Sequence, residues 1–173
     1  MNPDARRLLR ELASRRGKEY GKLVQKLLAL ALLDAGATEV YERSTQGIDL
    51  EFRRDAIRFA VEVKTCEGRK LRLGAKDLAG LESRANAGIA TYLAVLGPGL
   101  LDDLRLARIA PGELVASKDL FLVELRAYRD AVLEAWIRPA FERAIHRHTQ
   151  RATTEGQSGL DVVLSQAPEY RHA

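Results

Sequence analysis

The stretch that decides the fold is GIDLEFRRDAIRFAVEVKTCEG, residues Gly47–Gly68. Its Ile, Phe, Ala and Val residues form an apolar pattern, yet Asp49, Glu62 and Lys64 stand where an ordinary strand would turn its charges to water. Side chains alternate along a strand, so Glu62 and Lys64 lie on one face, about 6–7 Å apart along the chain. If the hairpin closes symmetrically about residues 55 and 56, Asp49 falls directly across from Glu62. The sequence therefore predicts that two carboxylates and an ammonium meet at one place.

Such a cluster is suited to a hard divalent cation. Two neighbouring carboxylates repel each other and raise one pKa unless a cation holds them together. Mg²⁺ prefers one or two carboxylates, with water and substrate phosphate completing its shell. Lys64 would then face the attacking water or the phosphate and neutralise charge that builds up in the transition state. A plainer interpretation stays open from spacing alone, in which Glu62 and Lys64 are an ion-pair ladder on the wet face of an edge hairpin.

The apolar pattern around this hairpin predicts a mixed sheet with helices on its faces. The expected helices cover residues 18–35 and about 75–87. The expected strands are residues 38–43, 48–52, 56–64, 89–97 and 120–125. The run at 89–97 is almost continuously apolar, which is typical of a strand covered on both faces. Residues 65–74 are expected to form a loop.

Residues 127–149 carry adjacent apolar pairs that repeat every four residues, which predicts a helix with a wide buried stripe. Pro139 is expected to kink this helix or divide it in two. The stripe could dock on the chain's own core or form a partner surface in a homo-oligomer. Beyond Gln150 the sequence is typical of a flexible tail, whose short apolar segment at 160–164 could dock or stay mobile.

Composition excludes several classes of protein. The chain has 173 residues, 46% hydrophobic and 30% charged, which suits one globular domain with room for an extension. No apolar run reaches the roughly 18 residues of a membrane span and no signal peptide is visible, so a cytoplasmic location is expected. The single cysteine excludes an internal disulfide. The chain lacks a phosphate-loop motif, so no nucleotide cofactor is expected.

The formal net charge of +4 is concentrated near the N-terminus. Residues 1–26 hold eight Lys or Arg against three Asp or Glu, whereas residues 127–173 hold six of each. This excess is equally compatible with a phosphate-binding patch and with a solvated basic helix. The basic residues concerned are Arg6, Arg7, Arg10, Arg15, Arg16, Lys18, Lys22 and Lys26.

The hairpin also resembles a known family. An Asp followed at a hairpin's length by Glu-x-Lys resembles the core of the PD-(D/E)xK nucleases. The segments GIDLEF, FAVEVKT and LRLGAKDLAGLESRANAGIATYLAVL are similar, in order and approximate spacing, to the archaeal Holliday junction resolvases, from about Gly17 to Leu125. The resemblance implies an α/β fold with a restriction-endonuclease-like mixed β-sheet flanked by helices. A nuclease core with a basic N-terminal helix would then occupy residues 1–126, and a helical extension with a flexible tail residues 127–173.

The resemblance implies a Mg²⁺-dependent endonuclease, able to use Mn²⁺, in which water attacks a phosphodiester. By analogy, Asp49 and Glu62 are metal ligands, the carbonyl of Val63 is a further ligand, and Lys64 is the catalytic lysine. The implied partner is DNA, in particular branched DNA. Because a four-way junction has two-fold symmetry, a homodimer is expected.

Family members also use a Glu on the first helix. Glu19 is the natural candidate, but Gln25 takes the equivalent place if the helix is one turn longer than the family's. Arg43 matches an Arg that the family carries in the strand before the catalytic Asp. Other expected DNA contacts, from this loop, the N-terminal charges and the loop after the active site, are Ser44, Thr45, Arg16, Lys18, Lys70, Arg72 and Lys76.

Other functions remain compatible with the same sequence, because a fold does not fix a substrate. A nuclease of this superfamily could act in repair, in restriction or in mobile elements. A catalytically inactive DNA-binding module of the same fold is a second alternative. A protein whose main role is assembly through residues 127–173 is a third.

Overall fold

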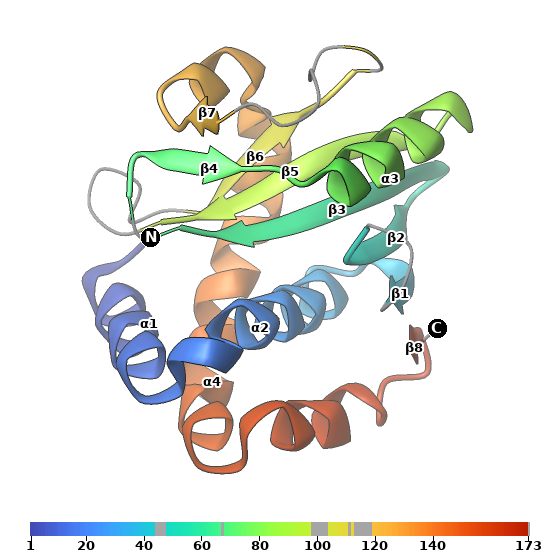
Figure 1. The fold of residues 1–173 in the computed structure, drawn as a ribbon. Helices are drawn as coiled ribbons and strands as arrows, with labels where there is room; N and C mark the ends of the chain where they lie inside the picture. Colours follow the sequence, from blue (N-terminus) through green and yellow to red (C-terminus); the bar gives the residue numbers. More distant parts are fainter. Residues whose placement is uncertain (44–47, 67, 98–103, 111, 113–118, 173) are drawn as a thin grey trace.

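The computed structural model describes residues 1–43, 48–66, 68–97, 104–110, 112 and 119–172, and a six-stranded mixed sheet lies at its centre (Figure 1). The order across the sheet is β6-β5-β3-β2-β1-β8. In chain order these strands are β1 (Thr38–Glu42), β2 (Leu50–Arg54), β3 (Ile57–Thr65), β5 (Ala90–Leu96), β6 (Arg105–Arg108) and β8 (Tyr170–His172). The central strand β3 pairs antiparallel with β2 and parallel with β5. This is the mixed α/β sheet that the sequence predicted.

The β2–β3 hairpin has the predicted register. Leu50 pairs with Val61 and Arg54 pairs with Ile57, so the hairpin is symmetric about its two turn residues. The first of these, Asp55, has a φ of 55°, a left-handed conformation that Asp adopts more readily than most residues. Extending the same register by one residue sets Asp49 opposite Glu62.

Helices cover both faces of the sheet (Figure 1). One face carries α1 (Pro3–Arg16), α2 (Tyr20–Asp34) and α4 (Ala131–Leu164), with the 3-10 turn η1 (Gly17–Glu19) between α1 and α2. The other face carries α3 (Ala75–Asn86) and a small ribbon of β4 (Lys70–Arg72) and β7 (Asp119–Phe121), followed by the 3-10 turn η3 (Glu124–Tyr128). The hydrophobic residues that cover the sheet form one buried cluster on each face.

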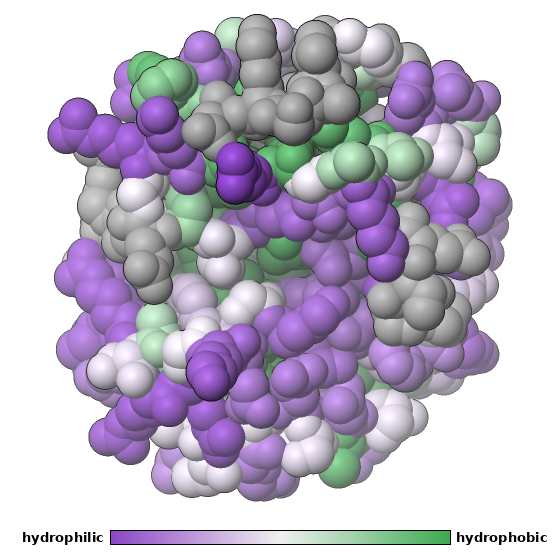
Figure 2. Space-filling view, in the orientation of Figure 1, coloured by the Kyte–Doolittle hydropathy of each residue, from purple (hydrophilic) through white to green (hydrophobic). Residues whose placement is uncertain are grey.

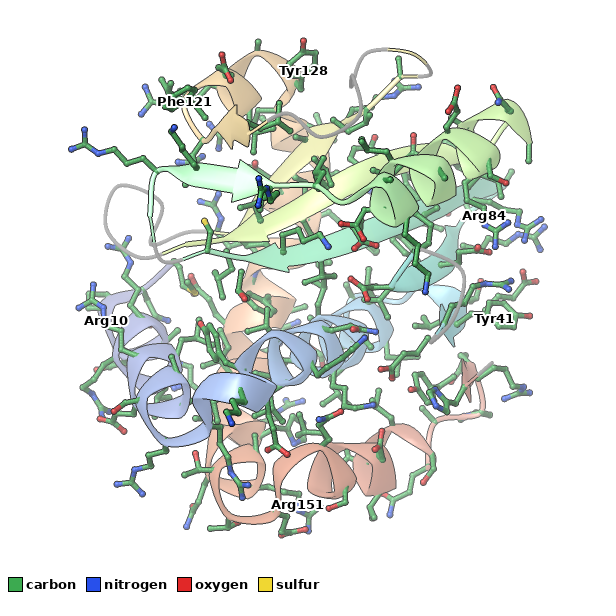
Figure 3. All side chains as sticks on the ribbon, viewed as in Figure 1. Arg10, Tyr41, Arg84, Phe121, Tyr128 and Arg151 are labelled. Carbon is green, nitrogen blue, oxygen red and sulfur yellow. The ribbon has the colours of Figure 1, made fainter. Side chains whose placement is uncertain are left out.

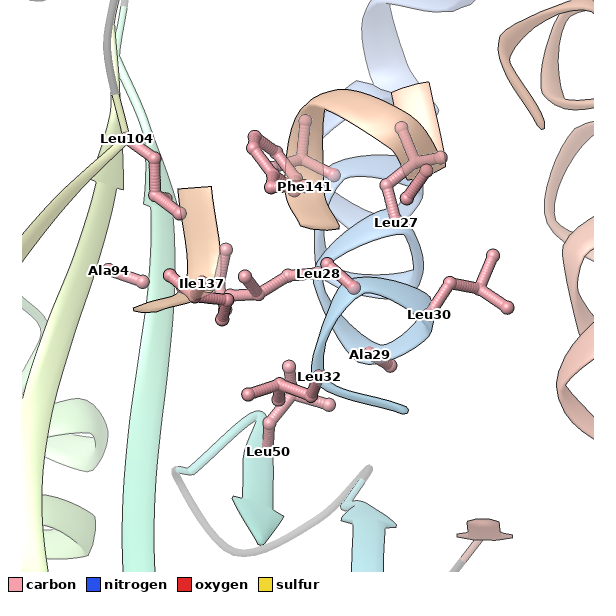
Figure 4. Packing of buried hydrophobic residues seen from close by; sticks show 14 of the residues in the cluster. Leu27, Leu28, Ala29, Leu30, Leu32, Leu50, Ala94, Leu104, Ile137 and Phe141 are labelled. Atoms are coloured by element: carbon pink, nitrogen blue, oxygen red, sulfur yellow. The ribbon is translucent and has the colours of Figure 1, made fainter. Parts of the chain in front are cut away.

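The larger cluster lies between the sheet, α2 and α4. Leu28 of α2 and Ile137 of α4 meet there, with Ala94 of β5 on the far side of Ile137 (Figure 4). Phe141 is fully buried in the same cluster. Burial of this side chain makes α4 part of the core, and it stabilises the fold by roughly 1.5–3 kcal/mol. The apolar stripe predicted for residues 127–149 therefore docks on the chain's own sheet and helices.

The structure corrects two expectations for the C-terminal part, namely that Pro139 divides the helix in two and that the chain beyond Gln150 is a flexible tail. The helical backbone continues through Pro139, and it departs from helical geometry at Gly156, where φ is 66° and ψ is −146°. The helix then continues to Leu164 through the segment expected to be a flexible tail, and Leu160 and Leu164 are fully buried. The packed stripe on both sides of Pro139 holds that turn in place, whereas only glycine tolerates the backbone angles at 156.

Strand β8 fastens the C-terminal part to the sheet. It pairs parallel with β1, in the register Val40 to Tyr170. The Tyr170 hydroxyl donates a hydrogen bond to the buried carboxylate of Glu42. Lys26 of α2 lies 2.9 Å from the same carboxylate and 2.5 Å from Asp161 of α4. Since Lys26 is buried in this network, it is not part of a phosphate-binding surface patch.

The small strands were the least predictable elements. The expected loop at 65–74 contains β4, and the expected strand at 120–125 is reduced to β7 and the turn η3. The ribbon β4–β7 stands apart from the main sheet, where β6 takes the edge position beside β5. In the part of the chain that the structure describes, no helix combines the length and the hydropathy needed to cross a lipid bilayer.

Candidate active site

The end of β3 brings the predicted charged residues together. The backbone N–H of Val63 donates to Asp49 Oδ2 at 2.9 Å, which fixes that carboxylate beside β3. Asp49 directly precedes the first residue of β2. The N–H and C=O of one residue in a strand point to the same side. The Val63 carbonyl therefore points to the side of β3 on which Asp49 lies. Glu62 and Lys64 point to the sheet face that α3 covers, as Ala60 does.

Lys64 lies between two carboxylates. Its Nζ is 2.7 Å from Glu62 Oε1 and 2.7 Å from Asp77 Oδ2. Asp77 stands in the first turn of α3, where its carboxylate also accepts a hydrogen bond from Gly74 N at 3.0 Å. An acidic residue at this helix position satisfies an otherwise unpaired N–H. The same carboxylate therefore starts α3 and holds the lysine.

Sequence reasoning missed Asp77. Its signal was an acidic residue three positions after Gly74, at the start of a predicted helix, which by itself indicates only a cap. The approach of α3 to the end of β3 depends on packing between Leu81, Leu71 and the sheet, which the spacing of charges does not encode.

The charges within the cluster shift one another. Burial, followed by the charge of Asp49, raises the pKa of Glu62 to about 7. Burial acts to lower the pKa of Lys64, but its hydrogen bonds to Asp77 and Glu62 outweigh burial and raise that pKa. For Asp77, burial acts to raise the pKa, but the hydrogen bonds from Lys64 and Gly74 outweigh it and lower the pKa. Lys64 is therefore a firmly protonated cation, and Glu62 is a carboxylate poised near neutral pH.

Helix α2 approaches the cluster with a cation and an amide. Lys22 Nζ lies 3.4 Å from Asp49 Oδ1 and 2.7 Å from Gln25 Oε1. Gln25 Nε2 donates to the backbone carbonyl of Asp49 at 3.3 Å and to Glu42 Oε1 at 3.1 Å. The one acidic residue of α2, Asp34, is at the opposite end of the helix and pairs with Arg143. Helix α2 therefore contributes no carboxylate to the cluster.

Glu19 does not reach the cluster, in contrast to the prediction. Its Oε2 pairs with Arg16 at 3.3 Å, and a Cβ placed on Gly156 would lie 3.2 Å from that oxygen. Glu19 thus faces the break in α4. The physical reason is the 3-10 turn η1, which separates Glu19 from the regular turns of α2 that face Asp49. Gln25, the alternative position, does reach Asp49.

Arg43 takes part in a second charged cluster on the sheet. Its Nε lies 3.1 Å from the buried Glu51, which also pairs with Arg84 of α3. Figure 3 shows Arg84 on the side of α3 nearest β2. Ser44 and Thr45, predicted to contact phosphate beside Arg43, lie outside the described residues.

The other predicted DNA contacts differ in exposure. Lys18, Lys70, Arg72 and Lys76 are exposed. The Lys70 ammonium lies 4.9 Å from the centre of the Phe121 ring on the β4–β7 ribbon. Arg16 instead donates from Nε to the carbonyl of Thr153 at 2.9 Å, so its guanidinium secures the break in α4. Hydrophilic residues predominate on the face of the molecule drawn in Figure 2.

The donors at the end of β3 fit a Mg²⁺ ion with few protein ligands. Asp49 and Glu62 supply two carboxylates, and the Val63 carbonyl points to the same side of β3 as Asp49. Across the described residues, no three side chains of the His, Cys, Asp and Glu types gather as a metal-binding group. Mg²⁺ needs only one or two carboxylates when water and substrate phosphate complete its shell. Burial, followed by the charge of Asp49, raises the pKa of Glu62, and a bound cation would relieve the part that comes from repulsion between the two carboxylates.

Comparison with known proteins identifies the fold. Neither a family model nor a curated protein sequence matches the chain. Among solved structures, it is similar to Hjc of Archaeoglobus fulgidus, a Holliday junction resolvase from an archaeal hyperthermophile. The match has a TM-score of 0.52 at 18% sequence identity, and covers 67% of this chain and 94% of Hjc. The chain has the resolvase fold. Nearly all of Hjc therefore has a structural counterpart in this chain, while about a third of this chain has none in Hjc.

Proposed function

We propose that this chain is a metal-dependent DNA endonuclease that cuts branched DNA, with four-way junctions as its main substrate. The observation that carries the proposal is the meeting of Asp49, Glu62 and Lys64 at the end of β3 in a resolvase fold. Outside this fold, an acidic residue followed two positions later by a lysine would indicate little, because such triplets are common by chance.

Each residue has a separate task in the proposed reaction. Asp49, Glu62 and the Val63 carbonyl would hold a Mg²⁺ ion, which when bound lowers the pKa of water and stabilises charge on the phosphate. Lys64 places its ammonium beside the phosphoryl oxygens, where negative charge grows as water attacks. The water oxygen bonds to phosphorus, the bond to the 3′ oxygen breaks, and the products are a 5′-phosphate and a 3′-hydroxyl. Asp77 keeps Lys64 charged and in position.

Binding would depend on backbone contacts. The exposed cations Lys70, Arg72 and Lys76 flank the site on β4 and α3 and would contact phosphates, which position DNA without reading its sequence. Arg43 would lie close to the strand that enters the site. A homodimer would present two such sites to the two symmetric strands of a junction.

A second candidate function is DNA binding without cleavage. The observation that favours it is the pairing of Lys22 with Asp49, which satisfies that carboxylate with a protein cation. In this case Asp49→Ala leaves DNA binding intact, and the parent protein does not cut DNA when Mg²⁺ is added.

The decisive experiment compares cleavage of three labelled DNAs, a four-way junction, a flap and a plain duplex, with Mg²⁺ present. Paired symmetric nicks in the junction are expected from the parent protein and from Glu39→Ala, because Glu39 pairs with Arg53 far from the site. Glu62→Ala is expected to yield no nicks. Equal products from Glu62→Ala and the parent would contradict the proposed site. Preferred cutting of the flap or the duplex would contradict the proposed substrate.

A further inference from the structure

A cavity of about 360 Å³ lies where α1 meets the ends of β3 and β5. Its lining combines cationic, aromatic and apolar side chains. The ones that matter to the argument are Arg6, Leu9, Arg10, Tyr20, Cys66 and Leu96. Among the described residues that line it, none carries a carboxylate. The cavity is within the range of roughly 300–1,000 Å³ in which proteins bind small molecules.

The cavity is close to the candidate active site. Thr65 and Cys66, which line it, directly follow Lys64 along the chain. Adjacent residues of a strand face opposite sides, so Lys64 faces α3 while Thr65 faces α1 and α2. Two residues of strand span about 7 Å, so the cavity and Lys64 lie within the reach of adjacent nucleotides of one DNA strand, on opposite faces of the end of β3.

The chemistry of the cavity suits one nucleotide. Arg6 and Arg10 are four residues apart on α1 and therefore lie on the same side of that helix. Planar guanidinium groups recognise phosphate well. Leu9 and Leu96 are buried and supply an apolar floor. Figure 3 shows Arg10 on α1, near the end of the sheet at which β3 and β5 finish.

Tyr20 adds an aromatic ring to the cavity. Burial raises the pKa of its hydroxyl to about 12, so the hydroxyl stays neutral and able to donate a hydrogen bond. Cations that follow the backbone, together with aromatic side chains beside the bases, are what proteins use to bind single-stranded nucleic acid. A duplex is far too wide for a space of this size, so the occupant would have to be unpaired.

We propose that this cavity holds one unpaired nucleotide of the strand that passes the candidate active site. The proposal rests on DNA being the substrate, and it adds that a four-way junction bound here has one nucleotide unpaired at its branch point, next to the cleaved phosphate. The base enters between Leu9, Tyr20 and Leu96, and its phosphate meets Arg6 and Arg10.

Cys66 makes the test direct, because it lines the cavity and is the single cysteine of the chain. The rate at which iodoacetamide alkylates Cys66 is measured by intact mass spectrometry, with EDTA present. The measurement is made with and without a short oligothymidylate. The Kd of the oligothymidylate is determined separately by fluorescence anisotropy. At an oligothymidylate concentration about ten times its Kd, alkylation is expected to slow about tenfold. A blunt duplex at the same occupancy should leave the rate unchanged. Unchanged alkylation under saturating oligothymidylate, equal protection by the duplex, or no oligothymidylate binding overturns the proposal.

Two substitutions on α1 provide a matched comparison. Arg10→Ala removes a cavity cation, whereas Arg7→Ala removes an exposed one that pairs with Glu11 on the helix surface. Oligothymidylate affinity is expected to fall about tenfold for Arg10→Ala and less than about twofold for Arg7→Ala. Equal losses would overturn the proposal. Since no step needs cleavage, a protein that fails to cut junctions can still pass this test, and one that cuts them can still fail it.

Discussion

The ammonium of Lys64 lies 2.7 Å from Asp77 Oδ2, although the two residues belong to β3 and to the first turn of α3. This pair joins the central strand of the sheet to the helix that covers it. It also leaves Lys64 shared between Asp77 and Glu62, so that the lysine is held on the sheet face from two directions. The position of the helix therefore sets the position of the lysine.

Replacing Asp77 by Asn should separate these two roles. Asn can still accept a hydrogen bond from Gly74 N, but it has no charge to hold Lys64. We expect Asp77→Asn to slow junction cleavage about tenfold with little loss of stability. Asp77→Ala should also lower the free energy of unfolding by about 1 kcal/mol, the typical value of a helix cap. Cleavage assays and thermal unfolding measure the two effects. Cleavage by Asp77→Asn at the parent rate would exclude a positioning role.

Glu62 should make the protein less stable as pH rises. Its pKa is raised from 4.5 to about 7 in the folded state, so the folded protein binds a proton that the unfolded chain has released. This contribution to the free energy of unfolding is complete below about pH 4.5 and is lost as pH rises through about 7. Glu62→Gln should therefore be more stable than the parent above about pH 7, by about 1–3 kcal/mol, and similar to it in acid. Urea unfolding over this pH range, without divalent ions, measures the difference. Parallel curves for parent and variant would contradict the expected shift.

Lys22 should control the affinity of the site for divalent ions. Its ammonium is half-exposed and pairs with Asp49, so Lys22→Glu exchanges a competing cation for a third carboxylate. We expect Lys22→Glu to bind Mn²⁺ about tenfold more tightly than the parent, measured by calorimetry. Lys22→Gln, which removes the cation alone, should give a smaller gain, and Lys18→Glu, the same charge change at another exposed lysine, should give little. Equal gains at positions 18 and 22 would indicate only a change in net charge.

Gly156 should contribute to the stability of the fold and not to chemistry. Its φ of 66° and ψ of −146° are accessible essentially to glycine alone, and a Cβ there would meet Glu19 and Arg16. Gly156→Ala should therefore cost about 1–3 kcal/mol of stability. Gly17→Ala is the control, because a Cβ at Gly17 has no heavy atom within 4 Å. If both variants melt at the same temperature, the break in α4 is not strained.

The part of the site that lies on the hairpin could be predicted from sequence, because it depends on local rules. Alternation along β3 puts Glu62 and Lys64 on one face, and a symmetric two-residue turn fixes the register with Asp49. The contribution of the helices could not be predicted in the same way. Glu19 was expected at the site and lies elsewhere because of a short 3-10 turn, whereas Asp77 was not expected and reaches Lys64 because of the packing of α3.

The fold shows the same division. Strands β2, β3 and β5 have strong apolar patterns and were predicted, whereas β4, β7 and β8 have three residues each and depend on partners distant in sequence. Pro139 was expected to interrupt α4 because an isolated helix would break there. In the protein the buried stripe runs through Pro139, and the backbone departs from helical angles at Gly156 instead.

Strand β8 has a consequence for how the protein behaves in concentrated solution. An uncovered β1 would offer a row of free N–H and C=O groups to any other strand, which is how sheets polymerise edge to edge. Strand β8 pairs with that row through Tyr170, Arg171 and His172, and the Tyr170 hydroxyl donates a hydrogen bond to Glu42. Detaching these residues would open the edge while leaving the hairpin intact, so aggregation would begin in molecules whose charged cluster on β3 is still folded.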